Sequence, residues 1–496
     1  MDLRSVCWCV LLSVLLSSYA EARRLFFRGR QFGGMLGSPR RGTNVTINVP
    51  DEYFEQQLDH FNPTEARTFQ QRYFTNASFH LPGGPVFLMI GGEAAANPAW
   101  VLEGQWINYA QKYHALCFML EHRFYGLSRP TKNIDTKYLR TLSSEQALSD
   151  LANFIEAMTI KYELPPNTKW IAFGGSYPGS LAAWLRAKFP HLVEGAVSAS
   201  APLLAKADFK EYYRVVKDDL SLYNSSCVSS LREANHGLRT LLKTPMGQET
   251  VNIMFRLCDP IDVLISNDVS ALYDTLAMNL AGIAQYNNEN RQETNEAINL
   301  NVVCKVMVNE SIGTPVHRYA AITNMILEQS GVMCLDYKYD SLISDLSEVD
   351  WESDYAEGAR QWFYQTCTEF GFYQTSSLTI DIFGNEFPLD FFVQQCADVF
   401  GKMFNKEQLM RGIRRTNINY GAMNQRASRI VYVHGSLDPW HALGITKTLD
   451  LQSPAIYIRG TAHCADMFAS LPSDPPQLQY ARKIIDSLIG LWLVEK

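Results

Sequence analysis

The sequence predicts an α/β fold in which a mostly parallel sheet carries helices on both faces and a large helical insertion interrupts the domain. Two observations predict it. Short, continuously apolar runs, typical of strands buried on both faces, alternate with stretches of helical spacing. This alternation stops near residue 205 and resumes near residue 428. Such an insertion is tolerated because closing a loop costs only about 0.6 kcal/mol more for each doubling of its length.

The elements follow in order along the chain. Strands are expected at residues 85–92, 115–120, 169–173 and 195–199, and again at 429–433 and 455–458. Helices are expected at 98–112, 143–161, 180–189 and 476–494. The expected parts are a signal peptide (1–22), an Arg-rich tail or pro-segment (23–44), a first α/β part (45–205), a helical cap (206–427) and a second α/β part (428–496).

The first residues have the pattern of a cleaved secretory signal. An apolar run over residues 6–16 is followed by small residues that end in Ala20-Glu21-Ala22. The run is shorter than the about 20 apolar residues that span a bilayer, and no later stretch is long enough, so no membrane span is expected. The segment 23–41 holds six arginines. It is interpreted as a disordered tail, or alternatively as a pro-segment cut at one of its two Arg-Arg pairs.

Composition and cysteine spacing exclude some classes of partner and cofactor. A net charge of -7 argues against a nucleic-acid partner, since such binding draws on clustered Lys and Arg. Eight cysteines remain after the signal and none forms a C-x-x-C pair, so neither a metal site nor a cofactor is expected. Several should be disulfide-bonded in an oxidising compartment. Four sequons are candidate glycan sites, beginning at Asn44, Asn76, Asn224 and Asn309.

A serine follows the third expected strand on a sharp turn into a helix, in the run Gly174-Gly175-Ser176-Tyr177-Pro178-Gly179. This is the arrangement of a nucleophile elbow in the α/β-hydrolase fold. The helix N-terminus offers backbone N–H groups to an oxyanion, with the Tyr177 N–H as one donor and Gly92 or Glu93 supplying the second. The alternative is an ordinary glycine-rich turn with a serine that caps the helix.

The late strands favour the catalytic interpretation. In this fold the triad runs Ser, then Asp or Glu, then His. Asp438 follows the 429–433 strand and His463 follows the 455–458 strand, so both lie at carboxyl ends, where ligand crevices form. His434 and His441 flank the aspartate, and His122 comes before the serine and breaks the order. The predicted triad is therefore Ser176, Asp438 and His463, with His463 as general base.

Several motifs carry a resemblance that spans nearly all of the chain after the Arg-rich tail. They are Gln57-Leu-Asp-His-Phe61, Gln71-Arg-Tyr73, Gly91-Gly-Glu93, Glu121-His-Arg-Phe-Tyr-Gly126, Gly174-Gly-Ser-Tyr177, Leu181-Ala-Ala-Trp184, Gln361-Trp-Phe-Tyr-Gln-Thr-Cys-Thr-Glu-Phe-Gly-Phe372, Leu437-Asp-Pro-Trp440 and Ala462-His-Cys464. With these the chain resembles the lysosomal Pro-Xaa carboxypeptidase and dipeptidyl peptidase II family of serine peptidases, and within it the thymus-specific serine protease branch.

The resemblance implies a capped α/β-hydrolase, the same triad, exopeptidase-like cleavage after proline in short peptides, and lysosomal, endosomal or extracellular residence. It implies disulfides Cys227–Cys304, Cys258–Cys334 and Cys367–Cys396, with Cys117 and Cys464 expected as free thiols. Substrate contacts are carried over to Trp440, Trp362, Tyr364 and Glu369. A homodimer is left open. Pro178 and Ser180 depart from the family pattern beside the nucleophile.

Two other functions are compatible with the same residues. One is an esterase or lipase, because a fold does not fix its substrate. The other is a hydrolase-like binding protein with a silent site, against which the intact triad argues. Peptide substrates are the expected partners.

Overall fold

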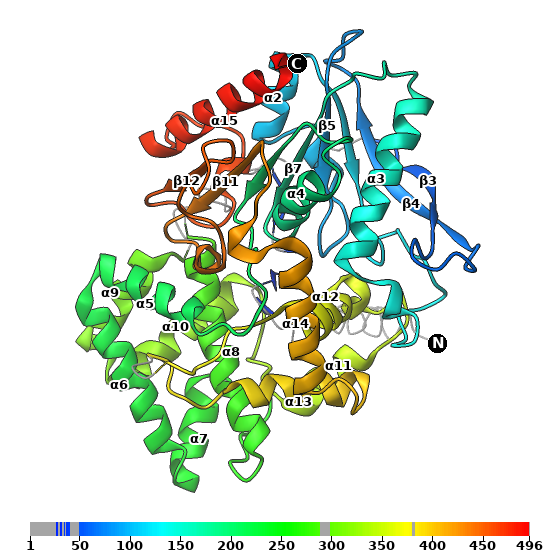
Figure 1. The fold of residues 1–496 in the computed structure, drawn as a ribbon. Coiled ribbons are helices and arrows are strands. Elements are labelled where there is room, and N and C mark those ends of the chain that lie inside the picture. The colour runs from blue at the N-terminus through cyan, green and yellow to red at the C-terminus, as the bar shows by residue number, and fades with distance from the viewer. Residues whose placement is uncertain are drawn as a thin grey trace, which may run out of the picture.

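An eight-stranded sheet forms the centre of the molecule (Figure 1). The computed structural model describes residues 26–27, 30–31, 34, 36–39, 49–287, 298–378 and 382–495. The strand order is β12-β11-β8-β7-β5-β6-β4-β3; neighbours from β12 to β6 are parallel, and β4 pairs antiparallel with both β6 and β3. The predicted α/β class with a mostly parallel sheet is confirmed. The strands of this sheet are β3 (Glu52–Gln57), β4 (Thr68–Asn76), β5 (Val86–Ile90), β6 (Leu116–Leu120), β7 (Trp170–Gly175), β8 (Gly195–Ala199), β11 (Ile430–Gly435) and β12 (Ala455–Ile458).

Alternate side chains of the strands divide the core into two layers. In β5, Leu88 belongs to the cluster packed against α3 (Ser144–Lys161) and α4 (Tyr177–Lys188), whereas Phe87 belongs to the cluster packed against α2 (Gln105–Tyr113) and α15 (Pro476–Val494). Figure 1 shows these two helix pairs on opposite faces of the sheet. Burial on both faces explains why the strands are apolar throughout.

Two expected helices have different bounds in the structure. The helix expected at 98–112 is two elements, the short 3-10 helix η1 (Pro98–Val101) and α2, separated at Gly104. Gly104 is the residue before α2 and has φ 95°, which is not helical, and a side chain there would meet the ring of Trp100, so this position requires glycine and separates the two helices. The helix expected at 180–189 begins earlier, at Tyr177, because the turn at Ser176 leads directly into it.

The segment between the two α/β parts is mostly helical and lies along one edge of the sheet (Figure 1). We call it the cap. Its helices are α5 (Glu211–Tyr223), α6 (Ser225–Leu241), α7 (Pro245–Met254), α8 (Ser266–Gln285), α9 (Leu300–Val308), α10 (Pro315–Gln329), α11 (Tyr339–Ser347), α12 (Ala359–Gln365), α13 (Leu389–Phe400) and α14 (Lys406–Tyr420). A short parallel pair, β9 (Lys206–Asp208) with β10 (Gly371–Tyr373), joins the start of the cap to the segment that follows α12. No helix in the described part of the chain has the length and hydropathy that crossing a bilayer requires.

The cysteines pair as the resemblance implies. Disulfides join Cys227 to Cys304, Cys258 to Cys334, and Cys367 to Cys396, and all three lie within the cap. Cys117 and Cys464 are buried free thiols.

The sequons differ in exposure. Asn224 and Asn309 are exposed at the starts of helices, where their side-chain oxygens accept backbone N–H groups and leave the amide nitrogen outside. Asn76 is different: its side chain is buried and its nitrogen donates to the Val101 carbonyl at 2.7 Å. The nitrogen that would carry a glycan at Asn76 is therefore enclosed in this structure, and glycosylation there stays a prediction. Asn44 lies outside the described residues.

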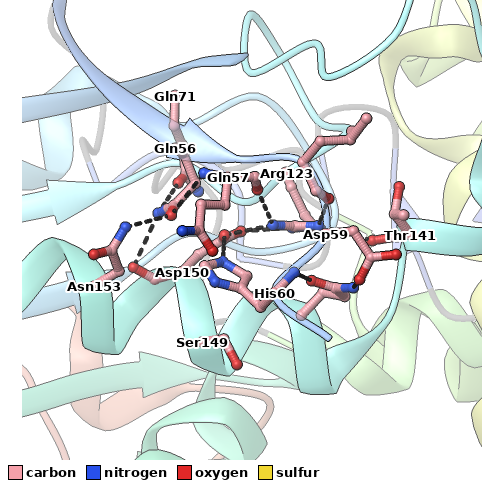
Figure 2. Close-up of polar contacts among 12 residues, drawn as sticks. Gln56, Gln57, Asp59, His60, Gln71, Arg123, Thr141, Ser149, Asp150 and Asn153 are labelled. Carbon is pink, nitrogen blue, oxygen red and sulfur yellow. Dashed lines mark hydrogen bonds and ion pairs between the residues drawn. The ribbon is translucent and has the colours of Figure 1, made fainter. Parts of the chain in front are cut away.

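A buried ion cluster ties the antiparallel edge of the sheet to α3. The Asp150 carboxylate accepts Nε of Arg123 at 2.6 Å and Nε2 of His60 at 2.7 Å (Figure 2). Arg123 also donates to the carbonyls of Leu58 and Thr141. Side chains of Arg123 and Asp150 are at most 1% exposed, so their charges depend on each other for solvation.

We expect Asp150→Asn to destabilise the fold by about 3–5 kcal/mol, because it leaves the Arg123 guanidinium buried without a counter-charge. The matched control is Asp390→Asn, which removes an exposed ion pair with Lys406 and should cost less than about 1 kcal/mol. Urea midpoints followed by tryptophan fluorescence compare the two. Equal midpoints would show that the cluster does not stabilise the sheet edge.

Candidate active site

Ser176 occupies a strained turn between β7 and α4. Its backbone has φ 63° and ψ -131°, a left-handed geometry that costs a non-glycine residue about 1–3 kcal/mol. The Ser176 N–H donates to the Ala199 carbonyl at the end of β8, which holds the turn against the neighbouring strand. The predicted nucleophile elbow thus has the backbone geometry that its role requires, with Ser176 at the N-terminus of a helix.

Asp438 and His463 come from the loops after β11 and β12 and meet directly. Nδ1 of His463 lies 2.9 Å from Oδ1 of Asp438, and both side chains are fully buried. The same Asp438 oxygen accepts the Trp440 N–H, so the carboxylate also caps the short helix η7 (Pro439–Leu443). Because β7, β8, β11 and β12 are successive neighbours in the sheet, their carboxyl ends bring the three predicted residues to one edge.

The residues flanking Ser176 and His463 are in contact. A side chain placed on Gly175 would lie 2.9 Å from Sγ of Cys464, and the Cys464 N–H donates to Oγ of Ser200, just after β8. The nucleophile turn and the histidine loop are therefore packed together.

The charges of the pair favour an ion-paired histidine. Burial alone would lower the pKa of His463, but the Asp438 carboxylate and its hydrogen bond outweigh this and raise it well above its ordinary value. Burial alone would raise the pKa of Asp438, but the charge of His463 and its hydrogen bond outweigh burial, so the pKa of Asp438 is lowered.

Nearby on α5, burial and then the charges of Asp218 and Asp438 raise the pKa of Asp219 to about 9, so this carboxyl is protonated near neutral pH.

At the other histidines near the site, burial outweighs the effect of the nearby carboxylates. Burial lowers the pKa of His434 and of His122 to about 4, so both rings are neutral. Burial also lowers the pKa of His441. Nε2 of His122 lies 3.0 Å from the hydroxyl of Tyr177, the residue that follows Ser176. This agrees with the choice of His463 from the chain order.

The loop after β5 lies against the nucleophile turn. A side chain on Gly92 would come within 2.5 Å of the Pro178 ring, so only glycine permits this approach. The loop is fixed by the buried Glu121 carboxylate, whose Oε2 accepts the Ala96 N–H at 2.9 Å while Oε1 accepts the N–H groups of Leu127 and Ser128. Gly92 and Glu93 are thereby held beside the first turn of α4.

Glu369, predicted to hold a substrate amine, caps a helix in this structure. Both of its oxygens accept the Ser144 N–H at 3.1 Å, at the start of α3. Gln365 lies between Glu369 and the Tyr177 hydroxyl and donates to both, at 3.4 and 3.1 Å. Burial raises the pKa of Glu369, more than the Ser144 bonds lower it.

Two of the predicted aromatic pocket residues are brought together and one is not. Trp362 and Trp440 both contact the Phe372 ring, at centroid distances of 6.4 and 5.4 Å, and Trp362 also contacts Tyr177 at 5.6 Å. These rings form a continuous row from the nucleophile turn to the Asp438 loop. Tyr364 packs instead against Phe400 and Phe404.

Two features at this edge were not predicted. One is Gln285, the last residue of α8, which contacts both the Asp438 and the His463 loops. The other is a cavity of about 370 Å³ beside the oxyanion loop, lined by Gly92, Glu93 and Pro178 and, on another side, by Gly34 and residues 36–38. No sequence signal points to Gln285, because its contacts are with loops far away in the sequence. Among the described residues no cluster of His, Cys, Asp or Glu has the arrangement of a metal site.

Comparisons with known proteins show the family to which the chain belongs. The family model described as Serine carboxypeptidase S28 matches residues 56–485. A serine protease of Caenorhabditis elegans is 36% identical over 98% of this chain and 97% of its own. The thymus-specific serine protease of Mus musculus is 35% identical, over 90% of this chain and 88% of its own. The lysosomal Pro-X carboxypeptidase of Bos taurus is 28% identical, over 92% and 90%.

The family model covers most of the chain, and the relatives match along nearly their whole length. The resemblance stated from the motifs is therefore confirmed, and the chain is a serine-type peptidase. It belongs to the Serine carboxypeptidase S28 family.

Proposed function

We propose that this peptidase hydrolyses peptide bonds through Ser176 as nucleophile, His463 as general base and Asp438 as the carboxylate that orients the histidine. The observation that carries the proposal is the fully buried 2.9 Å contact between His463 Nδ1 and Asp438, placed at the sheet edge where the strained Ser176 turn lies. A carboxylate on Nδ1 fixes the tautomer that leaves Nε2 to accept a proton.

The catalytic cycle follows from these roles. Oγ of Ser176 attacks the scissile carbonyl carbon while His463 Nε2 takes the hydroxyl proton, giving a tetrahedral oxyanion. The protonated His463 then gives this proton to the departing amine, and an acyl-enzyme remains. Water, deprotonated by the same histidine, hydrolyses the ester and restores Ser176.

The oxyanion is stabilised by backbone donors on two elements. The Tyr177 N–H lies in the first turn of α4, where the helix dipole favours negative charge. The second donor is the N–H of Gly92 or Glu93, whose loop is pressed against Pro178 and fixed by Glu121. Donors held rigidly before the reaction stabilise developing charge without reorganisation.

Cleavage after proline, as an exopeptidase on short peptides, is the proposed specificity. The rings of Trp362, Phe372 and Trp440 lead from Tyr177, next to Ser176, to the Asp438 loop, and an apolar aromatic lining there would suit a proline ring. The cap lies over this edge of the sheet, so a chain end has easier access than the middle of a folded protein. Glu369 and Tyr364 remain in the proposal as candidates, although their present contacts are with Ser144 and with Phe400 and Phe404.

The disulfides indicate the compartment in which the enzyme folds. The disulfides fit folding in the secretory pathway, and we place the mature enzyme in lysosomes, in endosomes or outside the cell, alone or as a homodimer.

Gly34 and residues 36–38 line the cavity beside the oxyanion loop. This favours the pro-segment interpretation of the Arg-rich tail, because cleavage after Arg41 would open that cavity.

We expect Ser176→Ala to lower turnover by about 10⁴ to 10⁶-fold and to abolish labelling by a fluorophosphonate, because the nucleophile is removed. Ser198→Ala is the matched control: this buried serine donates to the Gly179 carbonyl and has no catalytic role. Peptidase assays and in-gel labelling of both folded variants test the prediction. Activity retained in folded Ser176→Ala would rule out this nucleophile.

Asp438→Asn should lower kcat by about 10⁴-fold, since an amide no longer selects the required histidine tautomer. The carboxylate raises the pKa of His463, and catalysis needs the neutral imidazole. Losing the charge should therefore move the acid limb of the kcat/KM profile to lower pH. In the control Asp219→Asn, the amide resembles the protonated acid already present near neutral pH, so activity should be kept. An unshifted acid limb in the residual Asp438→Asn activity would contradict this assignment.

Matched short peptides with Pro or Ala before the scissile bond test the specificity. The missing ring carbons are worth about 1–3 kcal/mol in an apolar pocket, so proline should be preferred roughly 10–200-fold in kcat/KM. A ratio near one, or efficient cutting within an intact folded protein, would defeat this part of the proposal and leave the triad untouched.

A further inference from the structure

One helix of the cap ends against both of the loops that carry the proposed acid and base. Helix α8 runs for 20 residues and ends at Gln285, whose side chain is completely buried. Gln285 lies far from the triad in the sequence, 155 positions before Trp440, yet it contacts both loops that carry the triad acid and base.

The side chain of Gln285 holds the aspartate loop. Its Oε1 accepts the indole N–H of Trp440 at 3.0 Å and the hydroxyl of Tyr212, on α5, at 2.7 Å. The backbone N–H of the same Trp440 donates to Oδ1 of Asp438 at 3.0 Å. One tryptophan thus connects the cap amide to the carboxylate that orients His463. Loss of the amide oxygen would leave a buried indole N–H without its acceptor, at a cost of about 1–3 kcal/mol.

The main chain of Gln285 holds the histidine loop. Its carbonyl accepts the backbone N–H of His463 at 3.0 Å. A carbonyl in the last turn of a helix has no partner within the helix, so this bond also satisfies the end of α8. The helix C-terminus carries a partial negative charge that favours the imidazolium formed during catalysis. The next residue, Tyr286, places its ring edge-on to the His463 ring at 6.1 Å.

We propose that Gln285 is a positioning residue through which the cap sets the relative placement of Asp438 and His463. Its described contacts are with Trp440, Tyr212 and the main chain of His463, so it acts through the two loops. It fixes one loop by its side chain and the other by its main chain, so the triad is complete only when the cap is docked. This inference rests on the proposed triad.

The test is Gln285→Leu, which keeps the size of the side chain and removes its acceptor. A misplacement of about 1 Å at the acid–base pair costs on the order of 10²-fold in rate, so we expect kcat to fall by that amount and KM to change much less. A looser Asp438–His463 contact raises the histidine pKa less, so the acid limb of kcat/KM should move to lower pH. Gln285→Glu retains an acceptor oxygen at the same distance and should recover most of kcat.

The matched control is Asn235→Leu, which removes a buried amide elsewhere in the cap. Asn235 donates to the Ile382 carbonyl and has no contact with either triad loop among those described. It should lower the melting temperature as Gln285→Leu does while leaving kcat and the pH profile unchanged. Wild-type kcat and an unshifted acid limb in folded Gln285→Leu would overturn the inference, as would an equal loss of kcat in the control.

A second variant covers the case in which Gln285→Leu does not fold. Trp440→Phe removes the indole N–H that donates to Gln285 and keeps an aromatic ring. If Gln285 acts through this bond, Trp440→Phe should also lower kcat and shift the acid limb, and the double variant should cost no more than the larger single one. Strictly additive losses, or an unchanged pH profile in Trp440→Phe, would mean that Trp440 acts on the substrate alone.

Ser176→Ala, measured in parallel, separates this inference from the proposed triad. Activity that survives Ser176→Ala removes the triad and the inference with it. Activity that depends on Ser176 but is indifferent to Gln285 removes the inference alone.

Discussion

Three consecutive polar side chains are buried after β6, and their need for partners shapes the site around them. Glu121 accepts the Ala96 N–H and so fixes the loop after β5; His122 contacts the Tyr177 hydroxyl beside Ser176; Arg123 pairs with Asp150 on α3. Each would be costly to bury alone, by several kcal/mol for a charge. All three side chains find their partners only because the loop after β5, helix α4 and helix α3 lie where they do. The described contacts of Glu121, His122 and Arg123 therefore support the elements around the site.

The strain at Ser176 depends on that support. A non-glycine residue keeps a left-handed backbone only where its surroundings allow no alternative. Here the Ala199 carbonyl holds one side of the turn, and the Gly92–Pro178 contact closes the other. The cap adds a third constraint from outside the sheet, because α8 contacts the loops that carry Asp438 and His463. The site is thus assembled from parts that each satisfy their own buried polar groups.

Much of this could be predicted from the sequence, and the limits have physical causes. The apolar strands and the order Ser176, Asp438, His463 are local signals, so the α/β class and the candidate triad could be read directly. Boundaries set by tertiary contact could not: the break at Gly104 depends on the Trp100 ring, and the burial of Asn76 depends on Val101. Gln285 could not be found because its role comes from a contact across 155 residues. The antiparallel hairpin of β3 and β4 was missed because its strands are rich in polar residues.

All three disulfides lie inside the cap, and none of them joins it to the sheet. A reducing environment rich in thiols would therefore break these disulfides and loosen the cap. The sheet, which its two apolar layers stabilise, would stay folded. The loops of Asp438 and His463 contact the cap through Gln285. The lifetime of the active enzyme would therefore depend on the redox conditions of its compartment more than on the stability of the sheet.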